Sequence, residues 1–261
     1  MSQRTVSLRG LIWWASAAAA VCAALASPRA AQAGDASLKY DIVVDPMAEV
    51  CLEGAGELTF WTTTLEKEGL HPTVEDGHAV LMLCANSGRF GLKFQEVIYT
   101  IFTSNEPGGS SRDGGFLIYG LNSRKAYARV ERKRNQSPYE HGEVVQKIEG
   151  SVAAIGGTTE DGWYVTATLS GELEPISKGE KLWQGPVHLP RAMTPEGEAD
   201  EVFDVRLSGV AETYTFAPES DTFSTGGDAS VSPLLNPVVF EPKLWLVRPV
   251  GVHAKTNNRP R

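Results

Sequence analysis

The chain has 261 residues, with 24 Lys and Arg against 32 Asp and Glu, so its net charge is −8 at pH 7. This acidic balance argues against nucleic-acid binding, which needs a basic footprint. Because 42% of the residues are hydrophobic, the composition also argues against a disordered protein.

Residues 1–33 have the features of a secretory signal peptide. Arg4 and Arg9 precede an apolar run from Leu11 to Ala26, and Ala31-Gln32-Ala33 offers a small-x-small cleavage site. The apolar run is shorter than the roughly 20 residues that a membrane-spanning helix needs. We therefore expect export to the periplasm or the extracellular space, and no integral membrane protein after cleavage.

Two cysteines, Cys51 and Cys84, remain after this cleavage. In an exported chain an even pair predicts one disulfide. A metal role is less favoured, because the chain has no Cys-x-x-Cys and no His within ten residues after Cys84. We expect a single domain over residues 34–250 and a flexible tail over residues 251–261.

Short stretches of alternating or β-branched residues predict strands along the whole chain. Taken in order, they are Lys39–Val44, Glu57–Thr64, His78–Ala85, Phe94–Phe102, Phe116–Tyr119, Ala126–Val130, Glu143–Ile155, Trp163–Leu173, Val202–Phe216 and Val238–Val247. Phe94–Phe102 also fits helical spacing, but its β-branched and aromatic residues favour a strand.

Three of these stretches predict finer detail. His78–Ala85 is apolar on both faces, which is typical of a central strand. In the stretch that begins at Trp163, alternation places Trp163 inside and Tyr164 outside. The apolar phase of Val202–Phe216 changes at Ser208-Gly209, which predicts a β-bulge at Gly209. We expect Glu143–Ile155, Trp163–Leu173 and Val202–Phe216 to form a meander.

About ten to twelve strands and no convincing helix predict an all-β protein, as an antiparallel β-sandwich. The alternative is a closed β-barrel.

No catalytic signature is present: the sequence has no Gly-x-Ser-x-Gly, His-Glu-x-x-His or phosphate-binding loop. Catalytic residues therefore cannot be named, and no cofactor is expected. The five histidines stand at positions 71, 78, 141, 188 and 253, without the spacing that would place two ligands on one element. No metal site is expected from them.

One segment departs from the acidic background. Six cations gather between positions 124 and 134, around Tyr127: Arg124, Lys125, Arg129, Arg132, Lys133 and Arg134. An aromatic ring beside guanidinium groups suits an anionic ligand, whereas the alternative is a charged edge strand that prevents pairing with other chains. The candidate ligand-binding residues are Arg124, Tyr127, Arg129, Arg132 and the outward-facing Tyr164.

The function expected from these features is that of an exported β-sandwich protein that binds or scaffolds in the cell envelope or outside the cell. The partners considered are an anionic glycan, a lipid head group and an envelope protein, and not nucleic acid. The alternatives are a secreted hydrolase or lyase acting on glycans and a periplasmic metal carrier.

Overall fold

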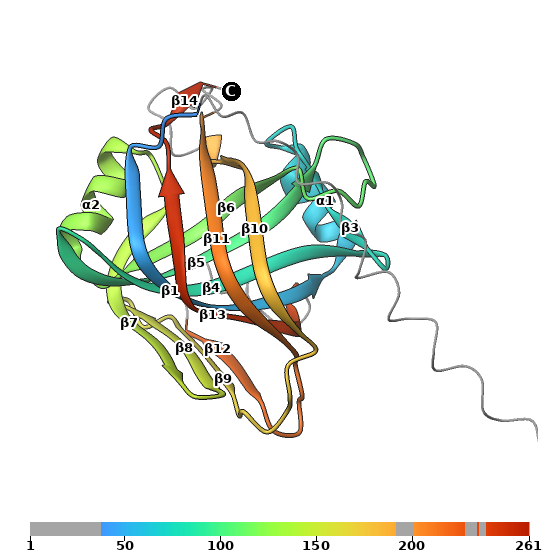
Figure 1. Ribbon diagram of the computed structural model, residues 1–261. Helices are drawn as coiled ribbons and strands as arrows, with labels where there is room; N and C mark the ends of the chain where they lie inside the picture. The colour runs from blue at the N-terminus through green and yellow to red at the C-terminus, as the bar shows by residue number, and fades with distance from the viewer. Residues whose placement is uncertain (1–37, 192–200, 228–233, 235–238, 261) are drawn as a thin grey trace, which may run out of the picture. The chain divides into compact units, whose positions relative to one another are not determined.

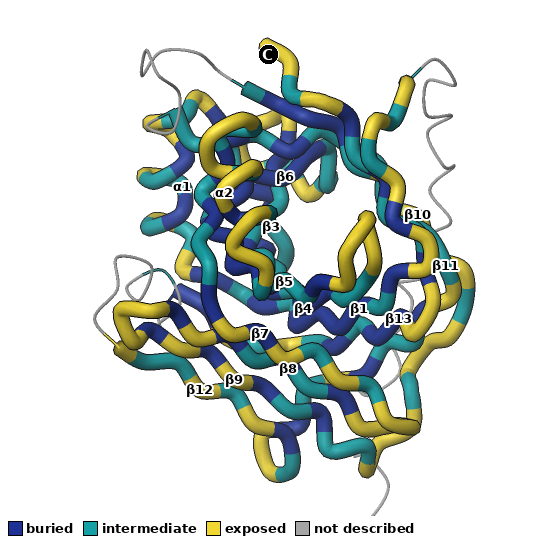
Figure 2. Tube along the Cα trace, turned by 90° about the vertical axis from the view of Figure 1, so that its left-hand side faces the viewer, coloured by how far each residue is buried: buried dark blue, intermediate teal, exposed yellow. Residues whose placement is uncertain are grey.

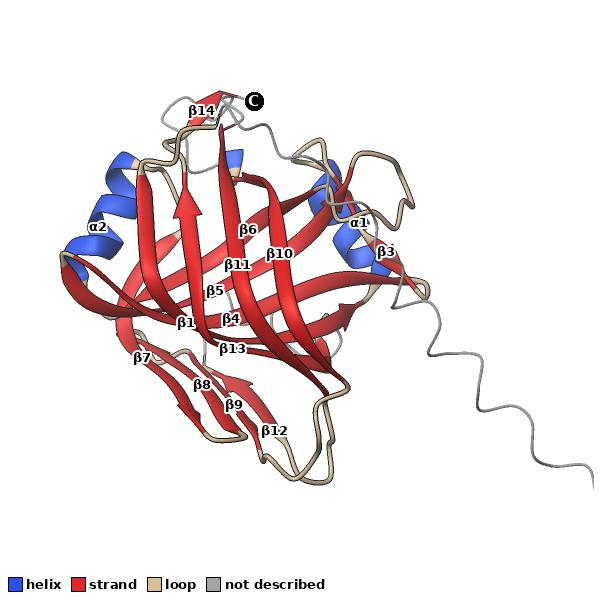
Figure 3. Ribbon diagram, viewed as in Figure 1, coloured by secondary structure: helices blue, strands red, loops and turns tan. Residues whose placement is uncertain are grey.

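The computed structural model describes residues 38–191, 201–227, 234 and 239–260. Strands dominate this part of the chain, with two short helices (Figure 3), so the predicted all-β class is confirmed. The predicted signal peptide lies outside the described residues. No helix among the described residues is long and apolar enough to cross a bilayer.

Seven strands close into a barrel. Their spatial order is β6-β10-β11-β13-β1-β4-β5, and β5 pairs again with β6. Figure 2 shows these strands around one ring. The bounds are β1 (Ile42–Gly56), β4 (His78–Phe90), β5 (Leu92–Ser104), β6 (Gly114–Asn122), β10 (Ser177–His188), β11 (Glu201–Thr215) and β13 (Glu241–Lys255). The closed barrel, which was the alternative prediction, thus describes seven of the 14 strands in the described residues.

A second layer of four strands lies against the barrel, as in a sandwich (Figure 1). It contains β7 (Tyr139–Glu149), β8 (Val152–Thr159), β9 (Tyr164–Leu169) and β12 (Thr222–Gly226). This layer continues from β6 through a parallel β6–β7 pairing; β6–β10 is also parallel, and the other described pairs are antiparallel. Three short strands complete the fold: β2 (His71–Pro72), β3 (Val74–Glu75) and β14 (Arg259–Pro260).

The main hydrophobic core fills the space between the barrel and the second layer. Trp61, Trp163 and Trp245 are fully buried there. Tyr164, next in the chain to Trp163, is 39% exposed, so the predicted alternation of this strand is confirmed. His78–Ala85 and Phe94–Phe102 are strands, as expected, within β4 and β5.

The predicted strand Glu57–Thr64 is wrong, because most of it forms helix α1 (Leu58–Glu66). The carboxylate of Glu57 caps this helix: it accepts hydrogen bonds from the backbone N–H groups of Thr59, at 2.9 Å, and Phe60. Trp61 and Leu65, one turn apart, then share the buried face.

The predicted strand Ala126–Val130 is also wrong, because this basic segment forms helix α2 (Lys125–Arg134). Ala128 is buried, while Ala126 and Val130 are exposed. The strand interpretation placed all three on one buried face. The helical period instead turns Ala126 and Val130 outward and Tyr127 toward the barrel.

Two further expectations need correction. The predicted meander is wrong in two respects: its first strand, Glu143–Ile155, is a hairpin of β7 and β8, and β9 pairs with β8 and β12 rather than with β11. The predicted tail 251–261 begins inside β13, which continues to Lys255, and β14 pairs with β11. The bulge at Gly209 is confirmed: the β11–β13 register shifts between Ser208 and Glu212, and Gly209 has φ +135°.

Candidate active site

The interior face of the barrel is set by the alternation along β4 and β5. One set of side chains is completely buried and points into the main core: Leu81, Leu83, Val97, Tyr99 and Ile101. The other set points into the barrel and keeps partial exposure: Met82, Cys84, Ile98 and Thr100. Because these strands lie in the middle of the sheet, this exposure means that solvent reaches the barrel interior.

One row of polar residues crosses the inner wall, with one residue from each of five adjacent strands. Pairing places Arg248 opposite Glu49, Glu49 opposite Asn86, Asn86 opposite Glu96, and Glu96 opposite Asn122. We call these five residues the polar row. All are buried except Glu96, which is half-buried. Buried charged side chains are uncommon unless they are paired. The partners of Glu49, Arg248 and Glu96 therefore determine how the barrel interior tolerates these charges.

Glu49 has two basic residues beside it, Arg248 and His253. The guanidinium Nη1 of Arg248 donates to Oε2 of Glu49, and Nε2 of His253 lies 3.3 Å from Oε1. Burial by itself would raise the pKa of Glu49, but His253 and Arg248 outweigh it and hold the pKa below its usual range. Glu49 is therefore a carboxylate that lies beside the ring of His253, within ion-pair distance of its Nε2.

Glu96 has the opposite character. Its carboxyl oxygens accept from the side chains of Asn86 and Asn122, both at 3.4 Å, and from the hydroxyl of Tyr139 at 3.2 Å. Burial, followed by the nearby charge of Glu131, raises the pKa of Glu96. Two interior carboxyl groups whose pKa values move in opposite directions are suited to different acid–base roles.

Several polar atoms inside the barrel have no hydrogen-bond partner among the described residues. Oδ1 of Asn86, Nε of Arg248 and Nε1 of Trp183 are three of them, and Nε2 of His253 is another, although it lies 3.3 Å from Oε1 of Glu49. Buried polar atoms are nearly always satisfied by protein, water or a ligand. The atoms of Asn86 and Arg248 belong to the polar row, so this wall offers both an acceptor and a donor to a bound molecule.

Apolar side chains form the other part of the interior. A separate cluster joins Leu117, Val187 and Phe203, with Ile98, Trp183 and Val205 against it. The side chain of Lys255 lies here, with Nζ 4.1 Å from the centre of the Phe203 ring and 2.9 Å from Glu131. An apolar wall facing a few polar groups is typical of small-molecule sites.

A disulfide lies beside the polar row. Cys51 and Cys84 face each other across β1 and β4, two residues along each strand from the Glu49–Asn86 pair, and their sulfur atoms are bonded at 2.10 Å. The disulfide is the pair that the cysteine count predicts. It fixes β1 and β4, two of the five strands that carry the polar row, relative to each other.

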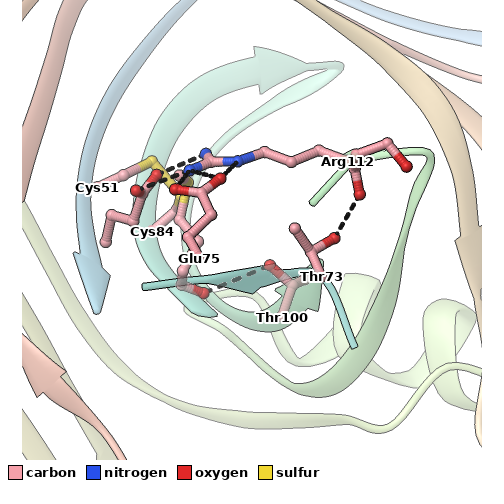
Figure 4. Close-up of polar contacts among 9 residues, drawn as sticks. Cys51, Thr73, Glu75, Cys84, Thr100 and Arg112 are labelled. Carbon is pink, nitrogen blue, oxygen red and sulfur yellow. Dashed lines mark hydrogen bonds and ion pairs between the residues drawn. A yellow bond between two sulfur atoms is a disulfide. The ribbon is translucent and has the colours of Figure 1, made fainter. Parts of the chain in front are cut away.

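Arg112 holds the other end of the interior (Figure 4). Its guanidinium makes two hydrogen bonds to Glu53, at 2.7 and 2.9 Å, and two to Glu75, at 3.1 and 3.2 Å. It also lies 4.8 Å from the centre of the Phe102 ring. Because two carboxylates already engage this guanidinium, Arg112 anchors the loop before β6 to the barrel.

The candidate residues from the sequence lie elsewhere. Arg124 is the N-cap of α2, Tyr127, Arg129 and Arg132 are on that helix, and Tyr164 is on β9 in the second layer. Tyr127 contacts the β4–β5 hairpin instead of facing outward with Arg129. No hydrogen bond or ring contact among the described residues joins Tyr164 to the other four.

Sequence reasoning missed the polar row. Of the five histidines, His253 lies beside the polar row, with Nε2 3.3 Å from Oε1 of Glu49. A signal was present around Cys51: Glu49, Cys51 and Glu53 alternate with the apolar Val50 and Leu52. Charges on the second face of an otherwise buried strand indicate a polar interior.

No family model and no curated protein matches the chain. Solved structures do. The chain shares the fold of acetoacetate decarboxylase. That enzyme matches with a TM-score of 0.54 and 10% identity over 84% of this chain and 88% of that chain. The enduracididine biosynthesis enzyme MppR, solved with pyruvate, matches with a TM-score of 0.58 and 11% identity, over 87% and 93%.

An acetoacetate decarboxylase-like enzyme from Sphingomonas wittichii RW1 has a TM-score of 0.52 and 11% identity, over 86% of this chain and 94% of that one. These enzyme barrels overturn the prediction of an exported β-sandwich binding or scaffolding protein. They also leave no support for the glycan hydrolase or lyase and the metal carrier. Export itself stays a prediction, because the segment that carries it lies outside the described residues.

Proposed function

We propose that this chain is an enzyme that binds a small oxo-acid inside its barrel and transfers protons to or from it. The observation that carries the proposal is the polar row, which places a carboxyl group of raised pKa and a histidine–carboxylate pair in one solvent-accessible interior. Perturbed titratable groups that converge in such a place mark candidate active sites.

Glu96 is the proposed general acid. The raised pKa keeps its carboxyl protonated to a higher pH than an ordinary glutamate, so that it has a proton to donate. His253 is the proposed second group, because its Nε2 lies 3.3 Å from Oε1 of the Glu49 carboxylate. His253 also lowers the pKa of Glu96 electrostatically, against the effect of burial. The two groups are therefore close enough to act on one bound molecule.

The substrate class rests on the interior donors. Nε of Arg248 has no partner among the described residues and would meet a carboxylate oxygen of the substrate. The apolar cluster around Phe203 suits a short carbon chain. MppR with this fold has been solved with pyruvate and with a condensation product of pyruvate, which supports an oxo-acid as the first ligand to test.

Proton NMR in heavy water tests the proposal with pyruvate and acetoacetate. Wild-type protein should exchange the protons next to the carbonyl or release carbon dioxide. Glu96→Gln should lower this rate by a factor of about 10²–10⁴, the usual contribution of a general acid. Glu143→Gln, the same change at an exposed position of β7, is the matched control and should leave the rate unchanged.

Equal rates for wild type and Glu96→Gln would exclude the assigned role. Borohydride trapping, read by the mass of the protein, separates proton transfer from imine chemistry on a lysine. Lys255 faces the interior but is paired with Glu131, so borohydride with pyruvate should leave the mass of the protein unchanged. An irreversible adduct at Lys255 would replace the proton-transfer mechanism with an imine.

A further inference from the structure

Helix α2 and the β4–β5 hairpin form one continuous surface at one end of the barrel (Figure 1). The hydroxyl of Tyr127 accepts from the backbone N–H of Leu92 at 3.0 Å and donates to the carbonyl of Phe90. Its ring contacts Phe94, with 5.6 Å between centroids. Nε of Arg124 donates to the carbonyl of Lys93 at 2.7 Å. The helix is therefore fixed on the hairpin.

This surface, which we call the basic end, concentrates positive charge on a chain of net charge −8. All its cations are exposed: Arg89, Lys93, Arg124, Lys125, Arg129, Arg132, Lys133 and Arg134. The acidic residue within α2, Glu131, is directed away from them into an ion pair with Lys255 at 2.9 Å. The positive field of the basic end is thus not neutralised by its own helix.

Large apolar side chains are exposed among these cations. Phe90 is 45% exposed and Leu92 is 58% exposed, at the hairpin turn between Arg89 and Lys93. Val130, on the outward face of α2, is 47% exposed. Exposed apolar groups flanked by cations are what a peripheral protein presents to a bilayer, where charge attracts head groups and apolar side chains enter the acyl boundary.

A groove next to the hairpin completes this surface. It has a volume of about 560 Å³, and Arg89, Lys93 and Arg124 line it together with the hydroxyl-bearing Ser87 and Ser123. Guanidinium, ammonium and hydroxyl groups are the donors that phosphate oxygens accept from.

We propose that the basic end docks the protein on a membrane surface rich in anionic phospholipid, with Phe90 and Leu92 entering the interface. Duplex nucleic acid shares the phosphate chemistry but offers no place for two apolar side chains at the tip of a hairpin. The apolar tip of the hairpin therefore favours an anionic membrane over duplex nucleic acid as the ligand. Glu131 links α2 to Lys255 and Glu96 of the barrel interior, but docking through the outward cations and the hairpin tip does not require the proposed catalysis.

Sedimentation with vesicles tests the proposal on the full chain. Binding to vesicles of phosphatidylglycerol and phosphatidylcholine is expected, and none to phosphatidylcholine alone. Arg129→Glu with Lys133→Glu should weaken binding at least tenfold, since each cation near an anionic surface accounts for roughly a fivefold change. Lys181→Glu with Lys243→Glu makes the same charge change at exposed positions of β10 and β13. This control should bind the vesicles more tightly than Arg129→Glu with Lys133→Glu, and should differ from wild type only by the effect of the lower net charge.

The apolar contribution has its own variant. Phe90→Ser with Leu92→Ser keeps every charge, so it should bind at low salt but lose most binding at about 0.15 M salt, where charge is screened. Ile176→Ser with Leu182→Ser, two other exposed apolar positions, is the control and should bind as wild type. Thermal unfolding should show that all four variants are folded.

Equal binding to neutral vesicles would overturn the proposal, and so would wild-type binding by the Arg129→Glu, Lys133→Glu variant. Mixed-sequence duplex DNA is the competing ligand. Binding to DNA that is tighter than to vesicles and unaffected by Phe90→Ser with Leu92→Ser would assign the basic end to nucleic acid instead.

Discussion

Glu49 and Arg248 form a charged pair in which both side chains are almost fully buried, at 3% and 4% exposure. Removing one partner of such a pair leaves an uncompensated charge inside the protein. The pair also fixes the carboxylate that lies beside His253. Stability and the proposed chemistry therefore depend on the same residue.

Glu49→Gln should lower the free energy of unfolding by about 3–5 kcal/mol at neutral pH, because Arg248 loses its countercharge. Chemical denaturation measures this. Glu241→Gln breaks the surface pair with Lys243 and should cost less than about 1 kcal/mol. Similar losses for the two variants would mean that the buried pair contributes no more than an exposed one.

The same variant has a defined pH dependence. The pKa of Glu49 is lowered in the folded protein, so its contribution is present above the ordinary pKa of glutamate and is lost as pH falls through the folded value. The stability difference between wild type and Glu49→Gln should shrink in acid. A difference that stays constant as the pH falls would contradict the lowered pKa.

Single residues also show where sequence reasoning ends. The alternation that buries Trp163 and exposes Tyr164 is local, and it was predicted. The contact between Glu49 and His253 depends on the pairing of β1 with β13, which no local pattern specifies. For that reason the place of His253 beside the polar row could not be recognised from the sequence.

At the scale of elements, a helix cap and a tertiary contact determine the secondary structure of two segments whose hydrophobic periodicity predicts strands. The segments 57–64 and 126–130 are short and alternate, so they fit strands. The Glu57 cap and the one-turn spacing of Trp61 and Leu65 make the first a helix, and the docking of Tyr127 on the hairpin holds the second. The Gly209 bulge, in contrast, was predictable because a phase change leaves a trace in the sequence.

Gly209→Ala tests that bulge. Gly209 has φ +135°, and a Cβ would lie 2.8 Å from the carbonyl oxygen of Val250 and 2.9 Å from Cα of Gly251. The variant should lose about 1–3 kcal/mol of stability from the backbone conformation alone. Gly179→Ala, on the paired strand β10 with no neighbour within 4 Å, should not lose stability, and an equal loss in both would place the cost elsewhere.

At the scale of the whole molecule, the all-β class was predictable, whereas the choice between a sandwich and a closed barrel was not. A strand that lines a barrel and a strand that lines a sandwich both have one polar and one apolar face. The difference lies in β6, which pairs with β5, β7 and β10 and so belongs to both layers. β6 has apolar residues on both faces, as any strand buried on both sides does, so its sequence does not reveal that it joins the two layers.

The disulfide acts at this scale, because it closes a loop between residues separated by 33 positions. Cys51→Ser with Cys84→Ser should lower the free energy of unfolding by about 3–4 kcal/mol on the chain-entropy model. Reduction of wild type should reproduce the loss in a denaturation experiment, and the double variant should not respond to reductant. A reductant-sensitive double variant would point to another cause.

The pairing of β1 with β13 has a consequence for how the protein is made. Val50 lies opposite Val247, and Ile42 lies opposite Lys255, so the earliest and latest long strands are neighbours. During synthesis β1 can pair with β4, but the edge of β1 that pairs with β13 stays unpaired until β13 leaves the ribosome. Contacts between such distant positions slow folding, and an unpaired strand edge attracts other chains. The nascent chain should therefore depend on chaperones until its last strand emerges.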